Sequence, residues 1–144
     1  QIVSRGQVRP DAAAWNTLIN AATQAGDATR AEHWLATMLE SGVAPNVRSH
    51  NTVLYAHAQA GNTEMAERGL QRMLADGIEP NTVSFTFLFH ACTKAGDGDR
   101  AEMWFDHMRA AGMQANVVNF GALLNVFAKS RDFKRAEKWF ARMH

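Results

Sequence analysis

Residues 26–46 read GDATRAEHWLATMLESGVAPN, and the chain writes this stretch again in register. Residues 61–81 read GNTEMAERGLQRMLADGIEPN, residues 96–116 read GDGDRAEMWFDHMRAAGMQAN, and a fourth copy begins at Arg131 with RDFKRAEKWFARM. Equivalent residues are always 35 apart, with no insertion or deletion after residue 11. A fixed period of this length is typical of architectures in which similar small units stack.

Each copy is predicted to form two helices. The stretch AAAWNTLINAATQA, which starts at residue 12, has apolar residues at helical spacing and contains no Pro or Gly. Gly26 then ends this helix, and Asp27 is a suitable N-cap for a second helix with Ala31 and Met38 on its apolar face. Neither helix can bury its apolar face alone. The sequence therefore predicts an all-α protein of stacked antiparallel helix-turn-helix repeats.

The period also sets the expected organisation of the chain. The sequence opens on Gln1 without an initiator Met, so we expect a processed chain or a part of a longer protein. The predicted units are 12–46, 47–81, 82–116 and a truncated 117–144, with 1–11 as the tail of a preceding repeat.

Composition excludes several classes of protein. A hydrophobic fraction of 47% and a net charge of +1 over 144 residues are ordinary for a globular domain, and no global field favours a polyanion. The single cysteine, Cys92, rules out an internal disulfide and is expected to be buried. No apolar run approaches the roughly 18 residues that a membrane span needs. The histidines are scattered and we find no catalytic constellation, so we expect no metal, no cofactor and no enzymatic activity.

The 35-residue period resembles that of the pentatricopeptide repeat family, and so do WNTLINA in the first helix, AGD at the turn and AExWLxxM…SGVAPN at the end of the unit. The resemblance covers essentially the whole chain. The tetratricopeptide repeat has a period of about 34 residues and a glycine after the leucine of its first helix, which does not occur here. The resemblance implies a right-handed α-solenoid superhelix in a mitochondrion or chloroplast that binds single-stranded RNA, one nucleotide per repeat.

The resemblance also implies which residues select the bases. In the family the fifth and last residues of a unit, here called a reading pair, choose the base together. An amide offers a donor and an acceptor, and a shorter threonine leaves room for a purine. The implied ligand is therefore pyrimidine-pyrimidine-adenine, while Gly121 leaves the fourth unit without a reading side chain. The reading pairs are Asn16 with Asn46, Asn51 with Asn81, and Thr86 with Asn116.

Two further sets of residues follow from the resemblance and from charge. The second residue of a unit sandwiches the base in the family; Arg48 departs from the usual aliphatic residue there, although a guanidinium plane can stack on a base. The predicted first helices, 12–25, 47–60, 82–95 and 117–129, contain no Asp or Glu, which favours a polyanion on that layer. The base-sandwiching residues are Ala13, Arg48, Val83 and Val118, and the expected phosphate contacts are Lys94 and Lys129.

Several alternatives stay open at this stage. Asn46, Asn81 and Asn116 each precede a predicted helix, where capping alone would explain them, and lysines at helix ends complement the helix dipole. The departures at Arg48 and Gly121, the near-zero net charge and the short array favour a different function. In that function the solenoid is a structural or assembly scaffold that contacts protein subunits of an organellar complex. Trp34, Trp104 and Trp139 are expected to pack between units rather than to stack on bases.

Overall fold

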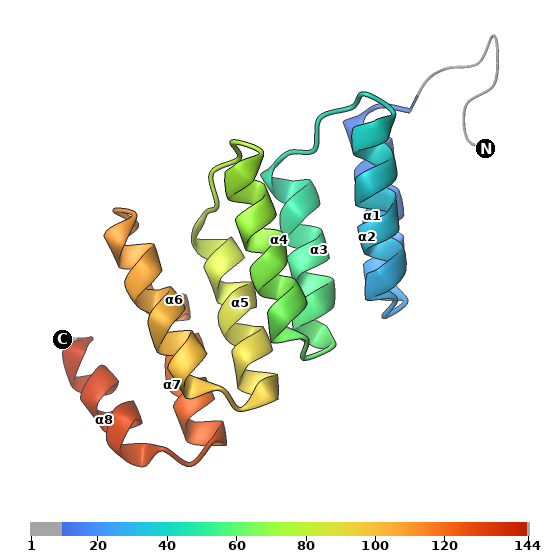
Figure 1. Ribbon diagram of the computed structural model, residues 1–144. Helices are drawn as coiled ribbons and strands as arrows, with labels where there is room; N and C mark the ends of the chain where they lie inside the picture. Colours follow the sequence, from blue (N-terminus) through green and yellow to red (C-terminus); the bar gives the residue numbers. More distant parts are fainter. Residues whose placement is uncertain (1–9, 144) are drawn as a thin grey trace, which may run out of the picture.

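The computed structural model describes residues 10–143, and every regular element in that part of the chain is an α-helix (Figure 1). Residues 1–9, most of the expected tail of a preceding repeat, lie outside the described residues, as does residue 144. The helices follow one another through short turns and form four hairpins. They are α1 (Ala12–Gln24), α2 (Ala28–Glu40), α3 (Val47–Gln59), α4 (Thr63–Ala75), α5 (Thr82–Ala95), α6 (Gly98–Ala110), α7 (Val117–Lys129) and α8 (Phe133–Arg142).

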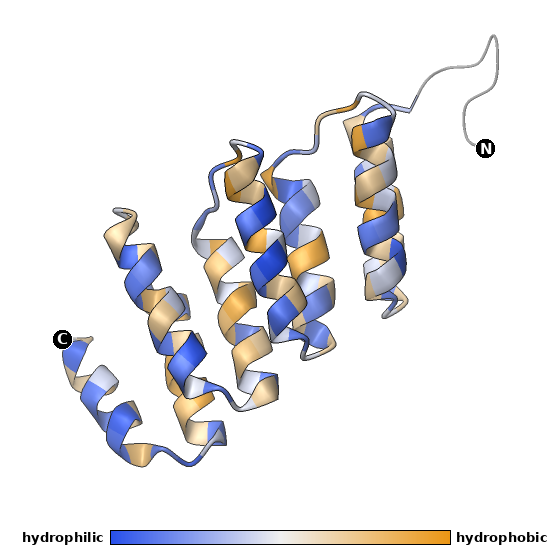
Figure 2. Ribbon diagram, in the orientation of Figure 1, coloured by the Kyte–Doolittle hydropathy of each residue, from blue (hydrophilic) through white to orange (hydrophobic). Residues whose placement is uncertain are grey.

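The hairpins stack into two layers, which confirms the predicted fold class. The first helix of each hairpin packs on the first helix of the next, so that α1, α3, α5 and α7 form one continuous layer. Each second helix packs against its own partner, and α2, α4 and α6 also contact the first helix of the following unit. The second helices α4 and α8 carry more hydrophilic residues than α5 and α7 (Figure 2).

Local sequence fixes the ends of the helices. Asp27 caps α2 as predicted, because its Oδ1 accepts from the backbone N–H of Arg30 at 3.0 Å. The turns inside the hairpins need a left-handed residue. Gly26 (φ 75°) fills this place in the first hairpin, whereas Arg131 adopts φ 61° in the fourth.

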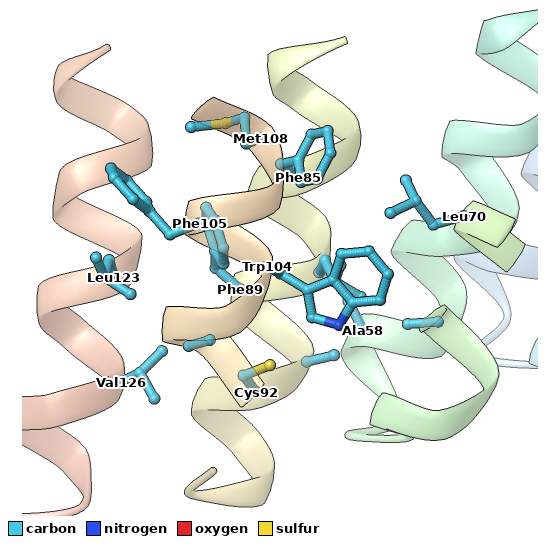
Figure 3. Close-up of a cluster of buried hydrophobic side chains, with 14 of the residues drawn as sticks. Ala58, Leu70, Phe85, Phe89, Cys92, Trp104, Phe105, Met108, Leu123 and Val126 are labelled. Atoms are coloured by element: carbon cyan, nitrogen blue, oxygen red, sulfur yellow. The ribbon is translucent and has the colours of Figure 1, made fainter. Parts of the chain in front are cut away.

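Apolar side chains from consecutive units merge into the core. In the larger cluster, Phe105 of α6 packs against Phe89 of α5 and Phe120 of α7. Trp104 of α6 points the other way, toward α4 and Leu70 (Figure 3). Cys92 is fully buried there, as predicted. Ala66 is fully buried in the same cluster, whereas Ala136 in the last hairpin is only partly buried.

A ladder of polar contacts joins successive second helices. Glu67 of α4 accepts from Trp104 Nε1 at 2.7 Å and from Arg100 Nε at 2.8 Å, both on α6. Glu102 of α6 accepts from Trp139 Nε1 at 2.7 Å and from Arg135 Nη1 at 3.2 Å, both on α8. The buried Trp104 and Trp139 thus pack between units as predicted, and each indole also anchors a carboxylate. Trp34, in the first unit, is only half-buried and contacts Trp15.

Candidate nucleic-acid interface

The structure brings the second reading pair into direct contact. Asn51 Nδ2 donates to Asn81 Oδ1 at 3.2 Å. Asn51 Oδ1 in turn accepts from Ser84 Oγ at 2.6 Å, and Ser84 is fully buried in the first turn of α5. The Ser84 backbone N–H donates to Asn81 Oδ1 at 3.0 Å, so a single serine holds both members of the pair.

The first reading pair is joined in the same way, through a serine at the same register. Ser49 Oγ donates to Asn16 Oδ1 at 2.5 Å, while the Ser49 backbone N–H donates to Asn46 Oδ1 at 2.9 Å. Asn46 is therefore a helix N-cap, which is the role that its position before α3 predicts. The Asn46 side chain therefore caps α3 and is also linked to Asn16 through Ser49.

The third pair uses an amide where the others use serine. Asn119 Nδ2 donates to Thr86 Oγ1 at 2.7 Å, and the Asn119 backbone N–H donates to Asn116 Oδ1 at 2.9 Å. The Thr86 hydroxyl itself donates to the backbone carbonyl of Thr82 at 3.0 Å. Thr86 therefore has acceptor capacity to offer a ligand but no free donor.

The caps also decide which way the amides face. A backbone N–H can only donate, so the atom of Asn46, Asn81 or Asn116 that faces the helix end must be Oδ1. The Nδ2 protons of these three residues are left for other partners. The first two pairs thus offer mainly donors, whereas the third combines the Asn116 donor with the Thr86 acceptor.

Cavities on the first-helix layer coincide with the reading pairs. A cavity of about 490 Å³ is lined by Asn16 and Asn46 together with the sandwiching residues Ala13 and Arg48. A second, of about 310 Å³, is lined by Asn51 and Asn81 with Arg48 and Val83 on its sides. Arg48 lines both cavities, and its side chain is exposed.

A third cavity, of about 560 Å³, is lined by Thr86, Val118 and Gly121. Gly121 therefore borders the cavity of the preceding unit. A Cβ added at Gly121 would meet nothing within 4 Å, so the space beside this residue is open. Asn116 and Val83 do not line it, and Asn116 is connected to Thr86 only through Asn119.

Aromatic side chains at the second cavity were missed from the sequence. The rings of Tyr55 and Phe87 pack with centroids 5.1 Å apart, and both line this cavity beside Asn51. The Tyr55 hydroxyl accepts from Gln59 Nε2 at 2.8 Å, which fixes the ring. A usable signal existed, because Tyr55 stands one helical turn after the reading residue Asn51 and therefore on the same face of α3.

The two lysines lie at the other end of this layer. Lys94 Nζ donates to the carbonyl of Gln59 at 2.8 Å, so Lys94 caps the end of α3 in the preceding unit. It stands eight residues after Thr86, about 12 Å along the helix. Lys129 is exposed at the equivalent position. The sequence left open that Lys94 complements the end of its own helix, whereas in the structure it bonds to the end of α3 in the preceding unit.

The described part of the chain offers no metal centre and no membrane span. Among residues 10–143, no group of three or more His, Cys, Asp or Glu side chains is placed to hold a metal ion. No helix within the same range is both long and apolar enough to cross a bilayer.

Burial, helped by the nearby carboxylates of Asp97 and Glu67, raises the pKa of the Cys92 thiol to about 12.

Two protein-family models together match residues 2–144. The model described as the pentacotripeptide-repeat region of PRORP matches residues 2–104, and the model described as a pentatricopeptide repeat domain matches residues 103–144. No curated protein matches the sequence.

Solved structures supply further similarity. The complex of the pentatricopeptide repeat protein PPR10 with an 18-nt psaJ RNA element has a TM-score of 0.88 at 30% identity and covers 98% of this chain and 20% of that chain. The structure of PPR10 from maize has a TM-score of 0.83 at 22% identity, and the match covers 96% of this chain and 20% of that chain. The PPR domain of Arabidopsis thaliana protein-only RNase P 1 in complex with tRNA has a TM-score of 0.77 at 22% identity, and the match covers 96% of this chain and 73% of that chain. This chain thus spans about a fifth of PPR10.

Proposed function

The chain belongs to the pentatricopeptide repeat family, and from this premise we propose that its first-helix layer binds single-stranded RNA, with one base in each of three consecutive cavities. One observation carries the proposal. Each cavity on this layer contains a reading residue that is hydrogen-bonded, directly or through one side chain, to its partner 30 residues further along. Groups held in place in this way lose little conformational entropy when a ligand binds.

The orientation of the amides supports the base preference. Cytosine and uracil offer two acceptors on the edge that pairs, which suits the donors of Asn46 and Asn81. Adenine combines an acceptor at N1 with an amino donor at N6. The Thr86 oxygen, which lines the third cavity, suits the N6 donor, and the exposed Asn116 amide outside that cavity supplies a donor for N1. The open space at Gly121 gives the larger ring room. The proposed core ligand is therefore pyrimidine-pyrimidine-adenine.

The layer also suits an anionic ligand by its charge. Its helices α1, α3, α5 and α7 contain no Asp or Glu, and Arg48 lines two of the cavities. PPR10 and protein-only RNase P 1 are both known in complexes with RNA. We propose for this chain a binding role without enzymatic activity, in a mitochondrion or chloroplast, as one part of a longer array.

The substitution Thr86→Asn tests the proposal, in an array extended with neutral repeats of the same family so that enough nucleotides are bound. Asn adds a donor and fills part of the third cavity, so preference at that nucleotide is expected to move from adenine toward a pyrimidine. The readout is the ratio of dissociation constants for RNAs that differ only at this base, with about 1–3 kcal/mol of discrimination at stake.

Arg48→Ala is the matched control. It leaves every reading pair intact and is expected to weaken binding to all sequences alike, with a shallower dependence on salt. If Thr86→Asn leaves the preference unchanged while RNA still binds, the reading-pair assignment is wrong. If the array binds no RNA even at low salt, the scaffold function for protein subunits replaces it.

A further inference from the structure

The junction between the first two hairpins lacks the ladder that joins the others. At the later junctions an arginine and a tryptophan from one second helix meet a glutamate on the preceding one. At the first junction Met65 stands in the register of the arginine and Gly69 in that of the tryptophan. The glutamate of the ladder does have an equivalent at this junction, which is Glu32 on α2.

Other side chains take over part of the missing contact. Arg72 Nη1 lies 3.1 Å from Glu32 Oε2, and His57 Nε2 lies 3.6 Å from Glu32 Oε1. Burial by itself would raise the pKa of Glu32, but the contact with His57 and the charge of Arg72 outweigh it and lower this pKa below its ordinary value. Glu32 is therefore a carboxylate, with fewer hydrogen bonds than Glu67 receives from Arg100 and Trp104.

Arg72 contacts both oxygens of Glu32 through one nitrogen, since its Nη1 also lies 3.3 Å from Oε1. It lies three residues after Gly69, toward the end of α4, and thus replaces the indole rather than the arginine of the later junctions. The side that belongs to Met65 stays open. A groove of about 770 Å³ occupies it, lined by Asp27, Glu32 and Met65 among others.

A buried polar atom beside this groove lacks a partner. His57 also lines the groove and is only 3% exposed. Its Nε2 makes no hydrogen bond, since the 3.6 Å to Glu32 is longer than a hydrogen bond. A buried imidazole nitrogen in this state is costly unless a further group completes its surroundings.

We propose that this groove binds an arginine side chain of a protein partner. The guanidinium takes the place that Arg100 and Arg135 occupy at the later junctions and pairs with Glu32, while its aliphatic stem lies along Met65. Arginine suits the site better than lysine because its planar fork can donate to the carboxylate through two nitrogens, as Arg100 does to Glu67. The groove lies between α2 and α4, outside the cavities of the first-helix layer, so the proposal is independent of RNA binding.

The test uses the whole chain and N-acetyl-L-arginine methylamide as the probe. Two-dimensional NMR follows the imidazole signals of His57 while the probe is added. A saturable shift is expected, with the lysine analogue binding roughly tenfold more weakly and the neutral citrulline analogue not at all. No saturable shift, or an equal response to citrulline, overturns the proposal.

Met65→Arg fills the groove with the chain's own guanidinium and provides the decisive variant. It is expected to abolish the response to the probe and to raise the melting temperature, whereas Met65→Leu keeps an apolar side chain and keeps the response. Glu32→Gln, whose side chain has nearly the same shape as that of Glu, is expected to lose the response of the His57 signals to the probe. If the probe still binds Met65→Arg or Glu32→Gln as it binds the parent chain, the groove is not the site.

Discussion

The side-chain amide of Asn51 donates to Oδ1 of Asn81 at 3.2 Å, so the fifth and last residues of one repeat hold each other. Ser84, the third residue of the next repeat, bonds to both. The arrangement places the reading pair on a rigid helix start. Under the proposed function, base selection depends on Ser84, which bonds to both members of the pair and is itself fully buried.

Removing that buried hydroxyl tests how much the pair depends on it. Ser84→Ala leaves Asn51 Oδ1 and the Asn81 N–H without a partner, so we expect a loss of about 1–3 kcal/mol of unfolding free energy and weaker selectivity in the second cavity. Urea denaturation measures the first effect. Ser130→Ala is the control, because Ser130 Oγ bonds only to carbonyls of its own helix and little change is expected.

The indole of Trp104 has a role beyond packing. Trp104→Phe keeps most of the buried ring but removes the donor to Glu67, which is 6% exposed, so about 1–3 kcal/mol of stability should be lost. Thermal and urea unfolding measure this. Trp34→Phe, at the same register of the first repeat but half-buried, should change stability less. Equal effects of the two substitutions would show that the glutamate contact contributes nothing.

Ala66 on α4 is fully buried in the larger core cluster. Ala66→Leu should overpack this cluster and cost about 1–3 kcal/mol. Ala75→Leu, near the exposed end of the same helix, supplies the control and should be nearly neutral. An unchanged melting temperature for Ala66→Leu would mean that the hairpin can open there without cost.

Arg131 carries the strain that glycine avoids in the other hairpins. Its φ of 61° is in the left-handed region, so Arg131→Gly should raise stability by up to about 1 kcal/mol. Arg131→Ala removes the guanidinium, which lies 5.8 Å from the centroid of the Phe133 ring, but keeps the strain, and it should give no gain. The comparison of the two variants by urea denaturation isolates the backbone contribution.

Cys92 should be unreactive in the folded chain. Its thiol pKa of about 12 exceeds the ordinary 9.0, so thiolate is scarce at pH 7–9 and alkylation by iodoacetamide should be far slower than in urea. The unfolded chain ionises first as pH rises. Fold stability should therefore fall between about pH 9 and pH 12, because the unfolded state binds fewer protons there. Rapid native alkylation at pH 8 would contradict the burial of this thiol.

Much of the fold follows from the sequence alone, because its signals are local. The apolar spacing and the capping side chains act within one or two helical turns, and the period of 35 repeats them. Together they fix the start of α2 after its N-cap Asp27 and the start of α3 after its N-cap Asn46. Since all units share one register, stacking was the only way to bury the apolar faces. The reading pairs were predicted from the family resemblance, which indicates their positions in the sequence but not the contacts that their side chains make.

The tertiary structure decided what those side chains contact. Whether Ser84 reaches Asn51, whether Lys94 caps Gln59, and whether Arg72 substitutes for a missing indole all depend on how one hairpin sits on the next. These partners are 33 to 40 residues apart, and their distances follow from the stacking of whole helices rather than from any local pattern. The sequence holds the period, but the side-chain bonds between units exist only once the solenoid has stacked.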